Sequence, residues 1–146
     1  MNHAIRNMLA VFAGIIIGGI VNMGLVMLGP VLIPSPEGVD LADVESLKQS
    51  AHLFTPIHYI TPFLAHSLGT FCGCLMAFLL ALKHKPILTY IVGGFYLLGG
   101  ITAANMIPAP TWFIAADLIL AYIPMAWLAI KIGNRILNLE PPANLD

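Results

Sequence analysis

Four long runs without formal charge constrain this chain more than any other feature of its sequence. They cover residues 8–28, 61–82, 87–107 and 111–130, and Asp117 is the only formally charged residue in them. At about 1.5 Å of rise per residue, a helix of this length crosses the roughly 30 Å hydrocarbon core of a bilayer. The strands of a closed barrel would be shorter, and apolar and polar residues would alternate along each strand. We therefore predict an all-α fold, an integral membrane four-helix bundle.

The composition agrees with lipid as the solvent of this chain. Only 9% of the residues are charged, whereas soluble domains carry about 25%. This excludes a soluble enzyme, a disordered tail and a disulfide-stapled secreted module. Six Lys and Arg against seven Asp and Glu provide no basic surface for nucleic acid. We expect the bilayer to be the partner and residues 1–146 to form a single transmembrane domain.

The distribution of charge predicts an orientation. Five of the six cations flank the runs on one side: Arg6, Lys83, Lys85, Lys131 and Arg135. The loop of residues 29–60 holds four carboxylates and a single Lys48. By the positive-inside rule, both termini are cytoplasmic and the loop is outside. The sequence has no Asn-x-Ser/Thr glycosylation site, which favours a bacterial inner (plasma) membrane.

Within the outer loop, the pattern predicts one short helix. Apolar residues recur every three or four positions between residues 41 and 54, which is typical of an amphipathic helix, and Asp40 is placed to cap its start. We expect this helix to lie on the membrane interface or over the bundle. Thr55 and Thr61 are each followed by proline, so the second long helix has two candidate starts.

A weak internal repeat relates the two halves of the chain. Residues 61–68 (TPFLAHSL) align with residues 111–118 (TWFIAADL), and both segments cross the membrane in the same direction. This similarity indicates a parallel duplication of a two-helix hairpin. Short apolar segments also match by chance, so both explanations stand here. In a duplication, His66 and Asp117 occupy nearly equivalent positions.

Small residues predict which helices pack closely. In lipid, helices associate where small side chains let their backbones approach. The second run has small residues at strict four-residue spacing, namely Ala65, Gly69, Gly73, Ala77 and Ala81. The first run has Gly14 and Gly18, and the third has Gly93, Gly94, Gly99, Gly100, Ala103 and Ala104. We expect the first three helices to pack through these residues.

Polar residues at membrane depth are the candidate ligand or proton-relay site. They are Asn22, His66, Thr102, Asn105 and Asp117. All but Asn105, which is shallower, lie about 7 to 9 Å below the outer boundary of their helices. Ionisable groups at this depth are costly unless they are paired or hydrated. We predict that His66 and Asp117 pair, and that Pro124 bends the fourth helix just below the carboxyl group.

Three interpretations of the predicted pair remain open: a structural contact, a transport or proton relay, and a ligand or metal site. Imidazole and carboxylate groups can ligate a divalent metal, which makes His52, His58 and His66 metal candidates, although their spacing matches no established motif. Cys72 and Cys74 are expected to pack as small apolar residues. We also expect Tyr122 and Trp127 to be packing residues.

No catalytic motif is evident, and the sequence does not identify a cofactor. We expect a non-catalytic accessory or complex-forming membrane subunit, present as a homo-oligomer or within a larger membrane complex. The alternative is a small-solute or proton-coupled transporter or channel that uses His66 and Asp117. A third possibility is a membrane-embedded enzyme or metal-binding module.

Overall fold

Long apolar helices make up most of the structure. The computed structural model describes residues 2–138, and every regular element in that part is helical. In chain order the elements are α1 (His3–Leu32), α2 (Val44–Ser50), the short 3-10 helices η1 (Ala51–Leu53) and η2 (Pro56–Tyr59), α3 (Ile60–Leu80), α4 (Lys85–Met106), α5 (Thr111–Leu120) and α6 (Ile123–Ile136). Four helical stretches are long and apolar enough to cross a membrane: His3–Leu32, Pro56–Leu80, Lys85–Met106 and Thr111–Ile136. The predicted all-α fold with four long apolar helices is confirmed.

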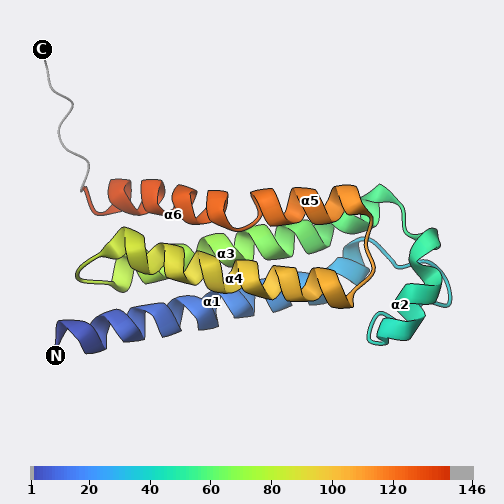
Figure 1. The fold of residues 1–146 in the computed structure, drawn as a ribbon, viewed down its shortest axis with the longest axis horizontal. Helices are drawn as coiled ribbons and strands as arrows, with labels where there is room; N and C mark the ends of the chain where they lie inside the picture. Colours follow the sequence, from blue (N-terminus) through green and yellow to red (C-terminus); the bar gives the residue numbers. More distant parts are fainter. Residues whose placement is uncertain (1, 139–146) are drawn as a thin grey trace, which may run out of the picture.

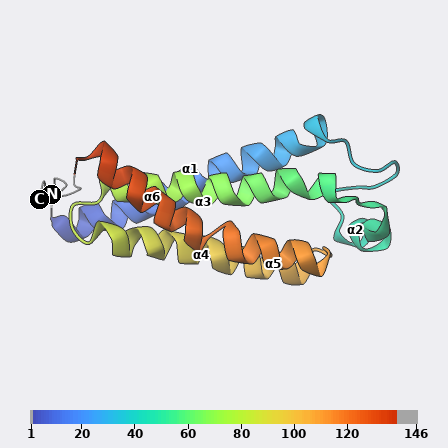
Figure 2. The same ribbon diagram turned by 90° about the horizontal axis from the view of Figure 1, so that it is seen from above.

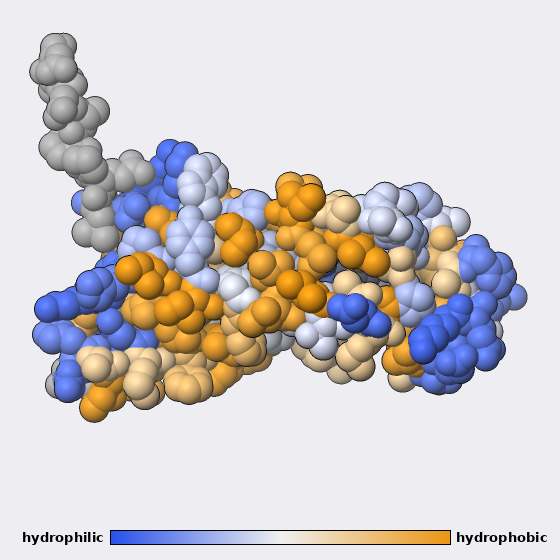
Figure 3. All heavy atoms as spheres, in the orientation of Figure 1, coloured by the Kyte–Doolittle hydropathy of each residue, from blue (hydrophilic) through white to orange (hydrophobic). Residues whose placement is uncertain are grey.

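The long helices lie side by side, and their ends form two groups (Figures 1 and 2). The start of α1, the turn of residues 81–84 and the end of α6 lie at one end, which we call the turn end. The loop of residues 33–59, including α2, lies at the other, which we call the loop end. Figure 3 shows hydrophilic surface at both ends and mostly hydrophobic surface between them. The most basic and the most acidic segments are thus separated by the length of the bundle.

Glycines let α1 and α3 approach until their backbones touch. A Cβ atom at Gly14 would lie 2.6 Å from the carbonyl oxygen of Gly73, and one at Gly69 would lie 3.0 Å from the carbonyl oxygen of Gly18. The predicted stripe of small residues on α3 is buried along its whole length: Ala65, Gly69, Gly73, Ala77 and Ala81. The expected close packing of the first two long helices is confirmed.

α4 packs through only two of its four glycines. A Cβ atom at Gly93 would lie 2.9 Å from a side chain of α6, and one at Gly100 would collide with the Tyr122 hydroxyl group. Gly94 and Gly99 have no such neighbour within 4 Å. The prediction is therefore wrong for Gly94 and Gly99, and the atoms nearest to Gly93 and Gly100 belong to Ala126 and Tyr122 of the fourth long stretch rather than to α1 or α3. Neighbouring residues of a helix point about 100° apart, so adjacent glycines cannot share one contact.

The first long helix is longer than predicted at both ends. α1 covers His3–Leu32, whereas the uncharged run covers only residues 8–28. At its start, the Asn2 side chain accepts a hydrogen bond of 3.1 Å from the backbone N–H of Ala4, which satisfies one of the free donors of the first turn. The helix therefore continues beyond the apolar run.

The fourth run does not form one continuous helix over residues 111–130. α5 ends at Leu120 and α6 begins at Ile123. Pro124 is the second residue of α6 and has no N–H to donate to the carbonyl group of Leu120, so the helical ladder cannot pass this point. The irregularity predicted from Pro124 is present, and it is a full break rather than a bend.

The loop helix is shorter than predicted and has a different cap. We expected it over residues 41–54 with Asp40 at its start, but α2 covers Val44–Ser50 and η1 follows. Asp43 is the cap, because its carboxylate accepts from the backbone N–H of Glu45 at 3.0 Å. The Asp40 carboxylate instead accepts from Ala42, within the turn that precedes the helix.

Of the two candidate starts of the second long helix, Thr55 is the one that caps. It precedes η2, which leads directly into α3, whereas Thr61 is already the second residue of α3. His58 completes the cap, because its ring Nδ1 lies 3.0 Å from the backbone nitrogen of Thr55 and accepts its hydrogen. The helical stretch thus begins at the earlier of the two predicted positions.

Candidate functional site

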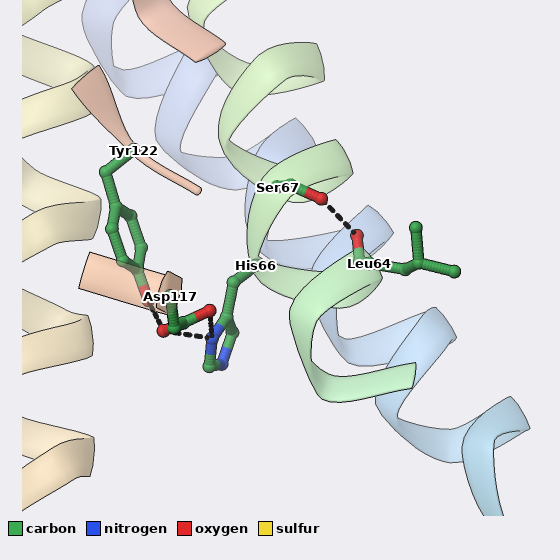
Figure 4. A network of polar contacts seen from close by, with 5 residues as sticks. All are labelled: Leu64, His66, Ser67, Asp117 and Tyr122. Carbon is green, nitrogen blue, oxygen red and sulfur yellow. Dashed lines mark hydrogen bonds and ion pairs between the residues drawn. The ribbon is translucent and has the colours of Figure 1, made fainter. Parts of the chain in front are cut away.

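The structure brings His66 and Asp117 into direct contact. His66 Nδ1 lies 3.0 Å from one carboxylate oxygen of Asp117 and 2.9 Å from the other. An ionised carboxylate only accepts hydrogen bonds, so Nδ1–H of the imidazole is the donor. His66 comes from α3 and Asp117 from α5, so the contact joins two of the long helical stretches (Figure 4).

Tyr122 is the third member of this cluster, and the sequence analysis missed it. Its hydroxyl group donates a hydrogen bond of 2.9 Å to a carboxylate oxygen of Asp117, and its ring centroid lies 6.0 Å from that of His66. Tyr122 is buried, as expected of a packing residue, but its hydrogen bond to Asp117 was not predicted. We call His66, Asp117 and Tyr122 the polar triad.

The break between α5 and α6 explains why Tyr122 can reach Asp117. On a continuous helix, side chains five residues apart point about 140° away from each other. Tyr122 lies in the break with φ −121° and ψ −78°, outside helical geometry, so its ring turns back toward α5 (Figure 4). Gly100 on α4 makes room for the hydroxyl group, since any side chain there would occupy the same space. Pro124 and Gly100 are the sequence signals that could have found Tyr122.

The triad is buried, but it is accessible from one side. The side chain of Asp117 is 6% exposed and that of His66 is 25% exposed, while Tyr122 is 2% exposed as a residue. A carboxylate in such a place is tolerable only with hydrogen-bond donors around it, and the imidazole and the phenol supply them. Ser67, beside His66 in sequence, does not join the triad, because its hydroxyl group donates to the Leu64 carbonyl oxygen (Figure 4).

The other members of the predicted polar layer do not gather around the triad. Thr102 and Asn105 are exposed on α4 and donate to carbonyl groups of their own helix, those of Leu98 and Ile101. Asn22 lies at the α1–α3 contact, because a Cβ atom added at Gly69 would lie 2.8 Å from the Asn22 Cβ atom. The prediction used depth along each helix, and depth does not determine direction around the helix. The predicted five-residue pocket is therefore reduced to a pair, to which Tyr122 is added.

The metal candidates His52, His58 and His66 do not form a site. Within residues 2–138, no group of three or more His, Cys, Asp or Glu side chains is placed to hold a metal ion. His58 has a local role instead, as part of the cap of η2. Both cysteines are free thiols, and Cys74 is buried with its Sγ 3.4 Å from the Thr89 carbonyl oxygen.

The arrangement can hold a proton between an imidazole and a carboxylate, and it can fix α3 against the α5–α6 break. The hydrogen bonds of the triad join His66 to a carboxylate and that carboxylate to a phenol. Comparison with family models, curated proteins and solved structures finds no match for this chain.

Proposed function

We propose that this chain is a multi-pass protein of the inner membrane that works as a non-catalytic, complex-forming subunit. The four long apolar stretches support the membrane assignment. The position of the basic residues at the turn end supports an orientation with both termini in the cytoplasm and α2 outside.

The observation that carries the assembly part of the proposal is the outward face of α4. Gly94, Gly99, Thr102 and Asn105 lie within an arc of about 140° around this helix. A Cβ atom added at either glycine would meet no atom of another element within 4 Å, and both polar residues are exposed. Small and polar residues on one face of a membrane helix are what helix pairs use to associate in lipid. We call this surface the α4 face.

A second copy of the chain is the occupant we propose for the α4 face. Asn105 uses its amide NH₂ within its own helix, and its amide oxygen keeps acceptor capacity for a donor on a neighbouring helix. An exposed amide facing only lipid would lose that hydrogen bond at a cost in free energy. Association of two such faces removes the cost and buries the open glycines.

Self-association can be tested by energy transfer between differently labelled copies in liposomes. We expect the wild type to associate and Gly99→Leu to dissociate, since the larger side chain blocks close approach. Gly24→Leu is the matched control, because Gly24 is also open, with no neighbour within 4 Å, but lies on α1. A monomeric wild type, or equal effects of the two substitutions, would contradict the proposal.

In this proposal the polar triad is a structural contact. It joins α3 to the fourth long stretch at the point where that stretch is broken, and it saturates the buried carboxylate with internal donors. Equivalent segments of the predicted hairpin repeat meet at this contact, which supports a parallel duplication as the origin of the fold.

A proton-coupled transport function is the second candidate, and the partial exposure of His66 favours it. Its side chain is 25% exposed while its partner carboxylate is 6% exposed, so the imidazole is the point where a proton could enter. This function predicts a pH-dependent proton flux in proteoliposomes that Asp117→Asn abolishes while the protein stays folded. Absence of flux in the wild type would exclude it.

A further inference from the structure

A cavity of about 220 Å³ lies at the loop end, separate from the polar triad. Its walls include Val26 and Pro30 of α1 and Thr61 of α3, and Leu41 and Leu47 cover it from the loop and α2. Figure 2 shows that α1 diverges from α4 toward this end, and that α2 lies beyond the ends of these helices. The cavity is therefore bounded by the long helices and covered by the acidic loop.

One wall of the cavity carries a backbone acceptor that has lost its helical partner. Pro30 lies inside α1 and has no N–H, so the carbonyl group of Val26, four residues earlier, receives no hydrogen bond from position 30. Both residues line the cavity. A ligand with an N–H donor can satisfy this carbonyl group, whereas a purely apolar ligand cannot.

The cover of the cavity is acidic. Asp40, Asp43 and Glu45 lie within two residues of Leu41 or Leu47, which line it. The only lysine of the loop, Lys48, lies 3.9 Å from the Glu45 carboxylate in an exposed ion pair. The loop thus carries excess negative charge beside a largely apolar cavity. Such a field attracts organic cations and repels anions.

We propose that this cavity binds a protonated primary alkylamine. The ammonium group donates to the Val26 carbonyl oxygen, and the alkyl chain occupies the apolar remainder. Donor capacity, positive charge and an apolar body are each matched by a separate feature: the carbonyl group freed by Pro30, the loop carboxylates and the apolar lining. This binding site is independent of the self-association proposed above.

The test uses n-octylamine as the probe, with the full-length protein in phosphatidylcholine nanodiscs and empty nanodiscs as the background. We expect saturable binding of octylamine, and binding weakened about tenfold in Pro30→Ala, the usual effect of losing one charged hydrogen bond. This substitution restores an N–H to α1 and favours the helix, so misfolding does not explain a loss. Pro86→Ala, at the start of α4 on the turn end, is the matched control and should bind as the wild type does.

Two related probes separate the contributions. Octyltrimethylammonium has charge but no N–H, so its binding should be equal in the wild type and in Pro30→Ala. The uncharged 1-octanol should compete only weakly, and Glu45→Gln should weaken octylamine but not octanol. The proposal is overturned if octanol competes as well as octylamine, if Pro30→Ala binds octylamine unchanged, or if nothing saturable exceeds the empty nanodiscs. Loss of octylamine binding in phosphatidylethanolamine nanodiscs would support recognition of a primary ammonium group and would identify the lipid headgroup as its source.

Discussion

Two contacts of α3 hold the bundle in opposite ways. Toward α1, α3 presents glycines, and the two backbones touch with no side chain between them. Toward α5 and α6, it presents His66, which reaches a carboxylate and, through it, a tyrosine. In lipid there is no hydrophobic force between helices, so packing and hydrogen bonds are the available means. The contact with α1 requires residues without side chains. The contact with α5 and α6 requires particular hydrogen-bonding side chains.

The largest effect should come from filling the glycine contact. A Cβ atom at Gly73 would lie 2.6 Å from the Gly14 carbonyl oxygen and 3.2 Å from the Gly18 Cα, and backbone atoms cannot move aside. We expect Gly73→Leu to lower the free energy of unfolding by about 3 kcal/mol or more. Unfolding in mixed detergent micelles measures this. Gly24→Leu, an open position on α1, is the control and should change stability little.

Removal of the carboxylate should have the next largest effect. Asp117→Ala leaves the imidazole and the phenol without their acceptor, and we expect a loss of about 1–3 kcal/mol. His66→Ala should cost less in the Asp117→Ala background than in the wild type, by about 1 kcal/mol, because the shared contact is already gone. Strictly additive losses would contradict the pairing as a stabilising contact.

A smaller effect should follow the loss of the Tyr122 hydroxyl group. Tyr122→Phe keeps the ring in place and removes one hydrogen bond, so we expect a loss of about 0.6–1 kcal/mol. Tyr90→Phe is the control, because Tyr90 is 39% exposed on α4. The same detergent unfolding assay applies, and equal effects of the two substitutions would show that Tyr122 contributes only its ring.

The smallest effect is expected outside both contacts. Thr102 donates only to the Leu98 carbonyl group of its own helix, so Thr102→Val should change the free energy of unfolding of the monomer by less than about 0.5 kcal/mol. A large loss would mean that Thr102 belongs to the polar cluster after all, as the depth estimate had suggested.

The two contacts also differ in how far the sequence revealed them. The stripe from Ala65 to Ala81 repeats every four residues, so the sequence alone indicates a continuous small face. The pairing of His66 with Asp117 followed from similar depth and from the cost of leaving either alone in lipid. Tyr122 could not be found in this way, because it reaches Asp117 only through a break in the helix.

The incorrect predictions for the polar residues and for the α4 glycines share one physical cause. Position along a helix is read directly from residue number, but direction around the bundle depends on which face meets a neighbour. Asn22 and Thr102 were predicted at similar depths and Asn105 slightly shallower, yet only the structure shows that Thr102 and Asn105 are exposed. Gly94 and Gly99 were misassigned for the same reason, because they lie beside the two glycines that pack.

The sequence by itself determined that the chain forms four long apolar helices, because uncharged runs of this length have few other solutions in lipid. It also determined the separation of acidic and basic ends and the weak point at Pro124, which lacks a hydrogen-bond donor. Only the tertiary structure decided that Tyr122 completes the triad, that half the glycines of α4 remain open and that a cavity forms beneath α2. Those outcomes depend on helix rotation and on contacts between distant segments, which no local pattern specifies.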